Sequence, residues 1–350
     1  MTDLDRLRER IAAIDEEIVR LMIQRNDTAK EIGEMKKAGG IPLIDRNVEK
    51  AVAERYRKAA ENSSLPDDVA VSICKMLIRS SVELQSSLLR KRCAKRVTVI
   101  GGIGKMGKWM VRYFESMGAK VNVIDVSVGA PEDMKDSDIV VVSVPVSSVG
   151  SVLADADRLC KKDALIFDIS SIKTPFASTL KEMATRRKVC SVHPMFGPSA
   201  RSMNERSVIV CNCGCEAAVS EASELFDNDD ADVIVTGIER HDELMAYVLG
   251  FAHASGITFF TALRESGIPF RELKRTAGTT FERFLAASTP VSEEDASLYH
   301  EIQKLNISSE DMWNVYENAV RKVREASLSD DVEMFSELME SGRKFLTDHR

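Results

Sequence analysis

The sequence has few of the features that place a protein outside the cell or in a membrane. Its seven cysteines are odd in number and show no disulfide framework, which argues against a secreted, disulfide-stapled fold. No apolar run approaches the ~20 residues of a membrane span, and the first ten residues, MTDLDRLRER, are too charged for a signal peptide. A net charge of −7 argues against general nucleic-acid binding, which depends on basic surface. We therefore expect a cytoplasmic protein with no membrane or nucleic-acid partner.

A bound metal is not expected either. Cys211, Cys213 and Cys215 form a C-x-C-x-C cluster, but no second cysteine pair or nearby histidine completes a ligand set.

The 350 residues suggest two or three domains, and a charged fraction of 29% is typical of a globular protein.

The most informative stretch runs from residue 96 to residue 125. An apolar run is followed by G-x-G-x-x-G, then by a helical pattern and a second apolar run that ends in Asp125. This order predicts a strand, a tight turn, a helix and a strand, with dinucleotide phosphates at the helix N-terminus. The terminal acid can accept hydrogen bonds from a ribose, which favours NAD over NADP. The predicted cofactor-binding residues are Gly102, Gly104, Lys105, Met106, Gly107, Asp125, Ser143 and Pro145.

Residues 1–92 predict an all-α domain of three helices. The first, from residue 4 to about 37, carries a heptad seam of apolar residues, and the others span about 45–60 and 66–92. Because the first helix is too long to pack only against its short partners, we expect it to form a dimer.

Several polar residues of these helices are spaced to share faces. Arg25 and Lys36 lie three helical turns apart, whereas Asp45 with Glu49 and Ser81 with Gln85 are i,i+4 pairs. From the charges alone, a solvated surface and a site for a small anion fit this pattern equally well.

Residues 93–236 predict a doubly wound α/β domain. Apolar runs alternate with helical patterns for most of this segment. Ligands of such sheets bind beyond the carboxyl ends of the strands, where Ser143, Ser171, Lys173 and His193 are expected to converge. A lone histidine is more often structural than catalytic. His193, however, ends an apolar run and precedes the rigid loop PMFGP, so we favour it as the base for a hydride step.

Residues 237–350 predict an all-α dimerisation domain. Apolar faces recur along the whole segment, with breaks expected near Pro269, Gly278, Pro290 and Ser327. The chain is therefore expected to contain a helical domain, a Rossmann-type domain and a second helical domain.

The segments LRERIAAIDEEIVRLMIQRNDTAKEIGEMK, IPLID and SSVELQ resemble the all-helical class of chorismate mutase. The resemblance implies that Arg25 and Lys36 hold the ether-side carboxylate of chorismate, and that Lys36 and Gln85 face the ether oxygen. It also implies that Arg8 reaches into the partner protomer's site. The residues near the ring hydroxyl and ring carboxylate would be Asp45, Glu49 and Ser81. One departure is Val48, which stands where the family usually has an arginine.

The segments SSIK, SVHPMFGP and ERHDELMAYVLGFAH resemble prephenate dehydrogenase. The resemblance implies that His193 accepts the proton of the ring 4-hydroxyl, that Ser171 hydrogen-bonds this hydroxyl, and that Lys173 supports the pocket. His253 would touch the substrate. For His241 with Asp242, a helix-capping pair and a substrate contact remain equal alternatives. The family's carboxylate-binding arginine is not at its usual position; Arg283 is the nearest candidate, with Arg275 behind it.

Together the two resemblances imply a bifunctional enzyme of tyrosine biosynthesis that converts chorismate to prephenate and then, with NAD, to 4-hydroxyphenylpyruvate. A homodimer is expected, and any feedback by tyrosine would act within these domains. Two alternatives remain: a β-hydroxyacid-type or arogenate dehydrogenase with a non-catalytic helical arm, and a nucleotide-sensing regulator. The β-hydroxyacid type would use a lysine on the domain-linking helix, and residues 239–256 contain none.

Overall fold

The computed structural model describes residues 2–41, 45–89, 91–227 and 231–348, which form two compact units. The first unit comprises Met1–Val144, Ser151–Ile169 and Met183–Val235, and the second comprises Pro145–Gly150, Ser170–Glu182 and Thr236–Arg350. The expected order of a helical, an α/β and a second helical part is confirmed. The finer division at residues 1–92, 93–236 and 237–350 stays a prediction.

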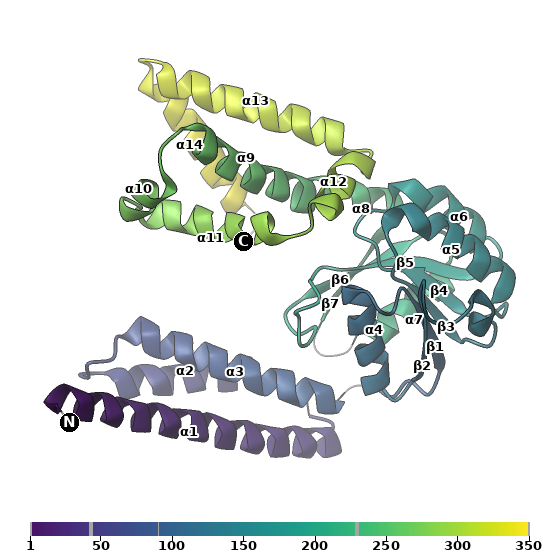
Figure 1. Cartoon of the computed structure of the whole chain (residues 1–350), viewed down its shortest axis with the longest axis horizontal. Coiled ribbons are helices and arrows are strands. Elements are labelled where there is room, and N and C mark those ends of the chain that lie inside the picture. The colour runs from purple at the N-terminus through teal and green to yellow at the C-terminus, as the bar shows by residue number, and fades with distance from the viewer. Residues whose placement is uncertain (1, 42–44, 90, 228–230, 349–350) are drawn as a thin grey trace. The chain divides into compact units, whose positions relative to one another are not determined.

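Three helices form the N-terminal part of the first unit (Figure 1), with α1 and α2 both packed on α3. The first begins with a capping box, because the Thr2 hydroxyl accepts from the Asp5 N–H at 3.2 Å while the Asp5 carboxylate accepts from the Thr2 N–H at 2.9 Å. It ends at Gly40, whose φ of 62° suits glycine. The helices are α1 Asp3–Gly39, α2 Arg46–Ala60 and α3 Asp67–Leu89, so the third ends slightly before the predicted Arg92.

The apolar seam of α1 is exposed in the single chain. Leu7, Ile11 and Ile14 are 52%, 61% and 51% exposed, whereas among the described residues of α1 only Ala29 and Gly33 are buried. A regular apolar seam that its own chain leaves uncovered is the surface that a second helix covers in a coiled coil.

A seven-stranded sheet forms the rest of the first unit, in the order β2-β1-β3-β4-β5-β6-β7. The first five strands in this order pair in parallel, and β6 pairs antiparallel to β5. This reversal follows from the sequence, because no helix lies between β5 and β6 to return the chain for a parallel pairing. The strands are β1 Arg96–Ile100, β2 Lys120–Ile124, β3 Ile139–Val142, β4 Leu165–Asp168, β5 Lys188–Pro194, β6 Ser207–Asn212 and β7 Asp232–Gly237.

Both faces of the sheet are buried. On one face, α4 and α7 cover a core in which the rings of Tyr113 and Phe226 stack with centroids 5.9 Å apart. On the other face, the alternate strand residues Val140, Val142 and Ile166 are fully buried as well. The sheet is therefore doubly wound, as predicted. The helices between the strands along the chain are α4 Lys105–Ser116, α5 Val146–Leu159, α6 Ala177–Ala184 and α7 Glu216–Phe226, with short 3₁₀ turns η1 Pro131–Met134 and η2 Thr174–Phe176.

The C-terminal helices belong to the second unit. Pro269 and Gly278 precede helices as predicted, but the expected break at Pro290 is wrong, because this proline lies in the last turns of α11. The continuous helix Ile238–Glu265 is long and apolar enough to span a membrane by length and composition alone; in the structure it contacts α11 and α13. The helices are α8 Ile238–Met245, η3 Ala246–Phe251 (a π-helical segment), α9 Ala252–Glu265, α10 Phe270–Arg275, α11 Thr279–Glu293, α12 Ala296–Leu305, α13 Ser309–Leu328 and α14 Val332–Thr347.

Candidate active sites

The glycine loop after β1 is too tightly packed to accept side chains. A Cβ on Gly107 would lie 2.0 Å from the Gly101 carbonyl oxygen, and one on Gly102 would lie 2.6 Å from Val123. Gly104 is the N-cap of α4 and provides no side-chain cap, so the first N–H groups of the helix are left for a phosphate group. The loop thus has the shape that the close approach of a pyrophosphate requires.

Gly101 is a residue of this loop that the sequence interpretation missed. Its φ is 81°, and a Cβ there would lie 2.0 Å from the Ser143 carbonyl oxygen. The signal was present in the doubled glycine at 101–102, of which the motif used only the second. Gly101 rather than Gly102 supplies the left-handed backbone conformation of the turn.

Asp125 follows β2 and contacts the same loop. One carboxylate oxygen accepts from the Ile103 N–H at 3.0 Å, and the other accepts from the Val126 N–H at 2.8 Å. The acid is therefore fixed beside the glycine loop, as its predicted role at the ribose requires. Lys105 and Met106 form the first turn of α4.

His193 lies at the carboxyl end of β5 and is 4% exposed. Ser143 follows β3 directly, at the same edge of the parallel strands. Just before this edge, the Ser191 hydroxyl donates to the fully buried carboxylate of Asp168 at 2.5 Å. Ser171, Lys173 and Pro145 belong to the second unit, so the predicted crevice that unites them with His193 stays a prediction.

Asp242 of α8 accepts hydrogen bonds from the segment that carries Lys173. Its carboxylate accepts from the N–H of Lys173 at 3.0 Å and from the N–H of Thr174 at 2.6 Å, and His241 Nδ1 lies 2.7 Å from it. Asp242 thus caps the helical segment that begins at Thr174 and not the N-terminus of α8, whose N-cap is Gly237. The substrate contact of His241 stays a prediction. The side chains of His241 and Lys173 are both fully buried.

Burial alone would raise the pKa of Asp242. The hydrogen bonds from His241 and Thr174 outweigh it, so this pKa lies below its usual value. A carboxylate with a lowered folded-state pKa stabilises the fold above its unfolded-state pKa, and this contribution is lost as the pH falls through the folded-state value.

We therefore expect Asp242→Asn to lower the free energy of unfolding by about 1.5–3 kcal/mol at neutral pH, the usual contribution of a hydrogen bond to a charged group. The difference from the wild type should narrow in acid. Denaturant titrations of the wild type and the variant, from neutral to acidic pH, measure this difference in stability. Asp330→Asn is the control, because Asp330 is exposed. A loss of stability that does not change with pH would contradict the role assigned to the charge.

His253 and Arg283 occupy different surroundings in the second unit. The His253 ring stacks on Tyr299 with centroids 4.1 Å apart, its Nδ1 is buried without a hydrogen-bond partner among the described residues, and burial lowers its pKa. It is therefore neutral at pH 7. Arg283 is exposed on α11. Both assignments as substrate-binding residues stay predictions.

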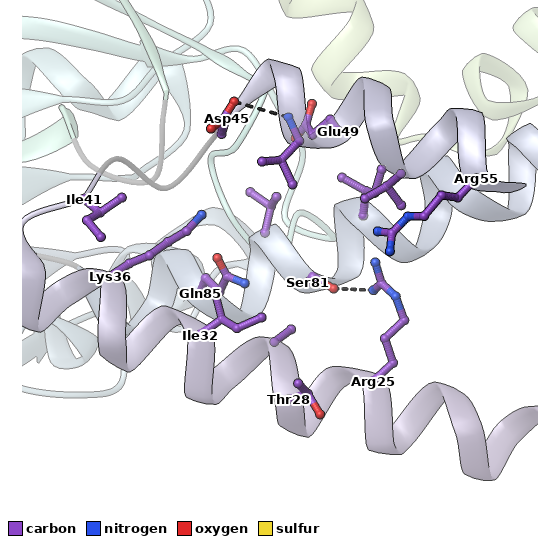
Figure 2. A pocket seen from close by; sticks show the side chains of 15 residues that line it. Arg25, Thr28, Ile32, Lys36, Ile41, Asp45, Glu49, Arg55, Ser81 and Gln85 are labelled. Atoms are coloured by element: carbon purple, nitrogen blue, oxygen red, sulfur yellow. Dashed lines mark hydrogen bonds between the residues drawn. The ribbon is translucent and has the colours of Figure 1, made fainter.

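The helices α1, α2 and α3 enclose a pocket of about 500 Å³ (Figure 2). It brings together six of the residues singled out in the first 92 positions, although they come from three helices. These residues are Arg25, Lys36, Asp45, Glu49, Ser81 and Gln85. Apolar side chains, among them Ile32, Val52 and Ile78, form the rest of the lining.

Hydrogen bonds hold three of these polar groups in place. Arg25 Nη1 donates to the Leu77 carbonyl oxygen at 2.7 Å and to the Ser81 hydroxyl, which itself donates to the Leu77 carbonyl at 3.0 Å. Ser81 and Gln85 are buried, whereas Asp45 caps α2 by accepting from the Asn47 N–H at 2.9 Å. One end of the pocket thus presents a guanidinium and a hydroxyl that are held in place.

Arg55 also lines the pocket, and the sequence interpretation missed it. Its signal was the spacing of seven residues from Val48, two helical turns, which puts the two on one face of α2. Arg8 is outside the pocket and exposed, with its guanidinium 3.9 Å from Asp5. Its predicted place in the site of a partner protomer stays a prediction.

The sequence matches three protein-family models in succession. Residues 7–86 match chorismate mutase type II, residues 110–235 match the nucleotide-binding domain of prephenate dehydrogenase, and residues 237–341 match the dimerization domain of prephenate dehydrogenase.

Known proteins agree with these matches. The chain is 24% identical to the T-protein of Haemophilus influenzae over 307 residues, which covers 86% of this chain and 81% of that one. It is 32% identical to the chorismate mutase of Methanocaldococcus jannaschii over 88 residues, covering 25% of this chain and 89% of the relative. The fold resembles prephenate dehydrogenase from A. aeolicus, solved in complex with hydroxyphenyl propionate and NAD+. The TM-score is 0.61 and the sequence identity is 17%, and the match covers 73% of this chain and 98% of that chain. The chain therefore belongs to the chorismate mutase and prephenate dehydrogenase families joined in one polypeptide, and is a bifunctional enzyme of tyrosine biosynthesis.

Proposed function

We propose that chorismate binds in the pocket of α1, α2 and α3 and rearranges there to prephenate. The observation that carries this proposal is the convergence of Arg25, Lys36 and Gln85 on one pocket with an apolar wall. A pericyclic rearrangement needs no nucleophile, base or metal. It needs the dicarboxylate held in its reactive shape and donors where negative charge grows on the breaking C–O bond.

The residues divide into those that hold the substrate and those that stabilise the transition state. Arg25 and Lys36 bind the ether-side carboxylate, and Lys36 and Gln85 donate to the ether oxygen as its bond breaks. Asp45, Glu49 and Ser81 lie toward the ring hydroxyl and ring carboxylate. Arg8 enters from the partner protomer, whose α1 covers the exposed apolar seam.

Prephenate is then oxidised and decarboxylated at the edge of the sheet. The glycine loop and Asp125 fit NAD, because the loop leaves no room for side chains and the acid would repel a 2′-phosphate. Ser143 follows β3 at the same edge, and Pro145 is the further residue proposed to contact the cofactor. When bound there, NAD would supply the acceptor for the hydride that leaves C4 of the substrate.

His193 takes the proton from the ring hydroxyl during this step. Ser171 holds that hydroxyl, Lys173 supports the pocket, and His241, His253 and Arg283 serve the substrate side. The resulting dienone loses carbon dioxide and becomes aromatic, which drives the reaction to 4-hydroxyphenylpyruvate. No general base is needed for the decarboxylation itself.

The protein is proposed to be a cytoplasmic homodimer that tyrosine regulates by feedback. The exposed seam of α1 and the match of residues 237–341 to a dimerization domain support the dimer. The seven cysteines are all free thiols, which fits a reducing compartment.

Purified protein, chorismate and NAD test the proposal in one cuvette. Chorismate should disappear and NADH should appear after a lag, because prephenate must first be formed. Prephenate alone should give NADH without the lag, and NADP should replace NAD poorly. Arogenate in place of prephenate tests the alternative substrate. Consumption of chorismate without NADH, or NADH formation only from a different hydroxy acid, would contradict the proposal.

A further inference from the structure

The mutase pocket lacks a cation at one of its positions. Val48, where chorismate mutases of this class usually have an arginine, lines the pocket with an apolar side chain that is 56% exposed. Valine cannot bind a carboxylate or a hydroxyl. The chain must therefore bind a dianionic substrate with a different set of cations.

Arg55 presents a guanidinium to the same pocket from the same helix. Figure 2 shows the ends of the Arg25 and Arg55 side chains turned toward each other, at the end of the pocket opposite Lys36 and Gln85. One cation comes from α1 and the other from α2, so an anion between them would be held from two sides.

The two guanidinium groups act on the same neighbouring thiol. Burial raises the pKa of Cys74, a fully buried residue of α3, while the charges of Arg25 and Arg55 oppose this rise. Both cations therefore lie near the same buried thiol of α3.

No acid in the described part of the chain neutralises Arg55. Neither a hydrogen bond nor an ion pair joins it to another described residue, and the adjacent Glu54 pairs with Arg57. Within the part of the chain that the structure describes, Arg25 is bonded only to a carbonyl oxygen and a hydroxyl. Asp45 lies nearer the other end of the pocket in Figure 2. Two cations that face each other without an acid between them repel, and a bound anion relieves the repulsion.

We propose that Arg55 is a substrate-binding residue of the mutase pocket and that, with Arg25, it clamps one carboxylate of chorismate. It supplies the second guanidinium that position 48 does not. A carboxylate has enough lone pairs to accept from both arginines at once, and the planar guanidinium suits this geometry better than an ammonium group. The inference rests on the proposed mutase function.

The test is the chorismate mutase activity of full-length Arg55→Gln, measured beside Arg57→Gln. Arg57 lies on the same helix, is exposed and does not line the pocket. We expect the KM for chorismate to rise about 10- to 100-fold in Arg55→Gln, the effect of losing a hydrogen bond to a charged group. The kcat should fall less, because the clamp acts on substrate and transition state alike. Arg57→Gln should resemble the wild type.

Two further variants keep the result interpretable. Arg55→Lys retains the charge without the planar fork, so its KM should lie between those of the wild type and Arg55→Gln. Adding Val48→Arg to Arg55→Gln should lower the KM again, because it returns a guanidinium to the same face of α2.

The outcomes separate this inference from the proposed function. If the wild type does not convert chorismate, the mutase function itself fails. If the wild type is active but Arg55→Gln keeps its KM, the function stands and the clamp is wrong. Circular dichroism shows whether Arg55→Gln and Arg55→Lys keep their helix content. If both lose it, and if Val48→Arg does not lower the KM of Arg55→Gln, the role of Arg55 is structural and the proposal is wrong.

Discussion

Replacing His193 with asparagine is expected to lower the rate of prephenate oxidation by about two to four orders of magnitude, the range over which a positioned general base acts. Asparagine has nearly the same size and can still hydrogen-bond, but it cannot take up the proton of the ring hydroxyl. Steady-state NADH formation from prephenate measures the loss. The KM for NAD should stay near the wild-type value, because the glycine loop and Asp125 are unchanged.

Two comparisons make the His193 result specific. His300→Asn carries the same substitution at an exposed histidine of α12 and should be fully active. Chorismate consumption by His193→Asn should also equal that of the wild type, because the mutase pocket is formed by α1, α2 and α3 and does not include β5. Oxidation of prephenate at an undiminished rate would remove His193 from the mechanism.

The second large effect is expected at Lys36. Lys36→Ala should lower chorismate rearrangement by at least about 10²- to 10³-fold, the effect of removing one donor that stabilises developing negative charge. The lysine faces the ether oxygen in the proposed mechanism, so kcat should fall, and kcat/KM should fall further because Lys36 also binds the ether-side carboxylate. Prephenate-dependent NADH formation should be unaffected.

The neighbouring Lys37→Ala is the matched control. Lys37 precedes the end of α1 by two residues, is exposed and does not line the pocket. If Lys36→Ala and Lys37→Ala reduce the mutase rate equally, the loss reflects a disturbed helix end rather than a missing donor.

Most of the architecture could be predicted from local patterns. The heptad seam identified α1, the glycine spacing identified the turn between β1 and α4, and i,i+4 pairs such as Ser81 with Gln85 identified one side of the mutase pocket. In each case the spacing of residues within one short segment is enough to predict the element or the shared face. The Rossmann-type sheet followed from the same reasoning.

The features that the sequence did not yield depend on long-range packing. Asp242 caps a segment that lies 68 residues away at Thr174, and no local pattern indicates that partner. Arg55 became a pocket residue only when α1 and α3 were placed around α2. Pro290 was expected to end a helix, but α11 continues through it to Glu293, although the missing N–H of the proline removes one backbone hydrogen bond.

Chorismate given to His193→Asn in the presence of NAD tests the central claim, that two separate sites act in sequence. Product analysis should show prephenate accumulating in equal amount to the chorismate consumed, with NADH formation reduced to a trace. Unconsumed chorismate, or NADH formed at the wild-type rate, would contradict the division of the two reactions between the helical pocket and the sheet edge.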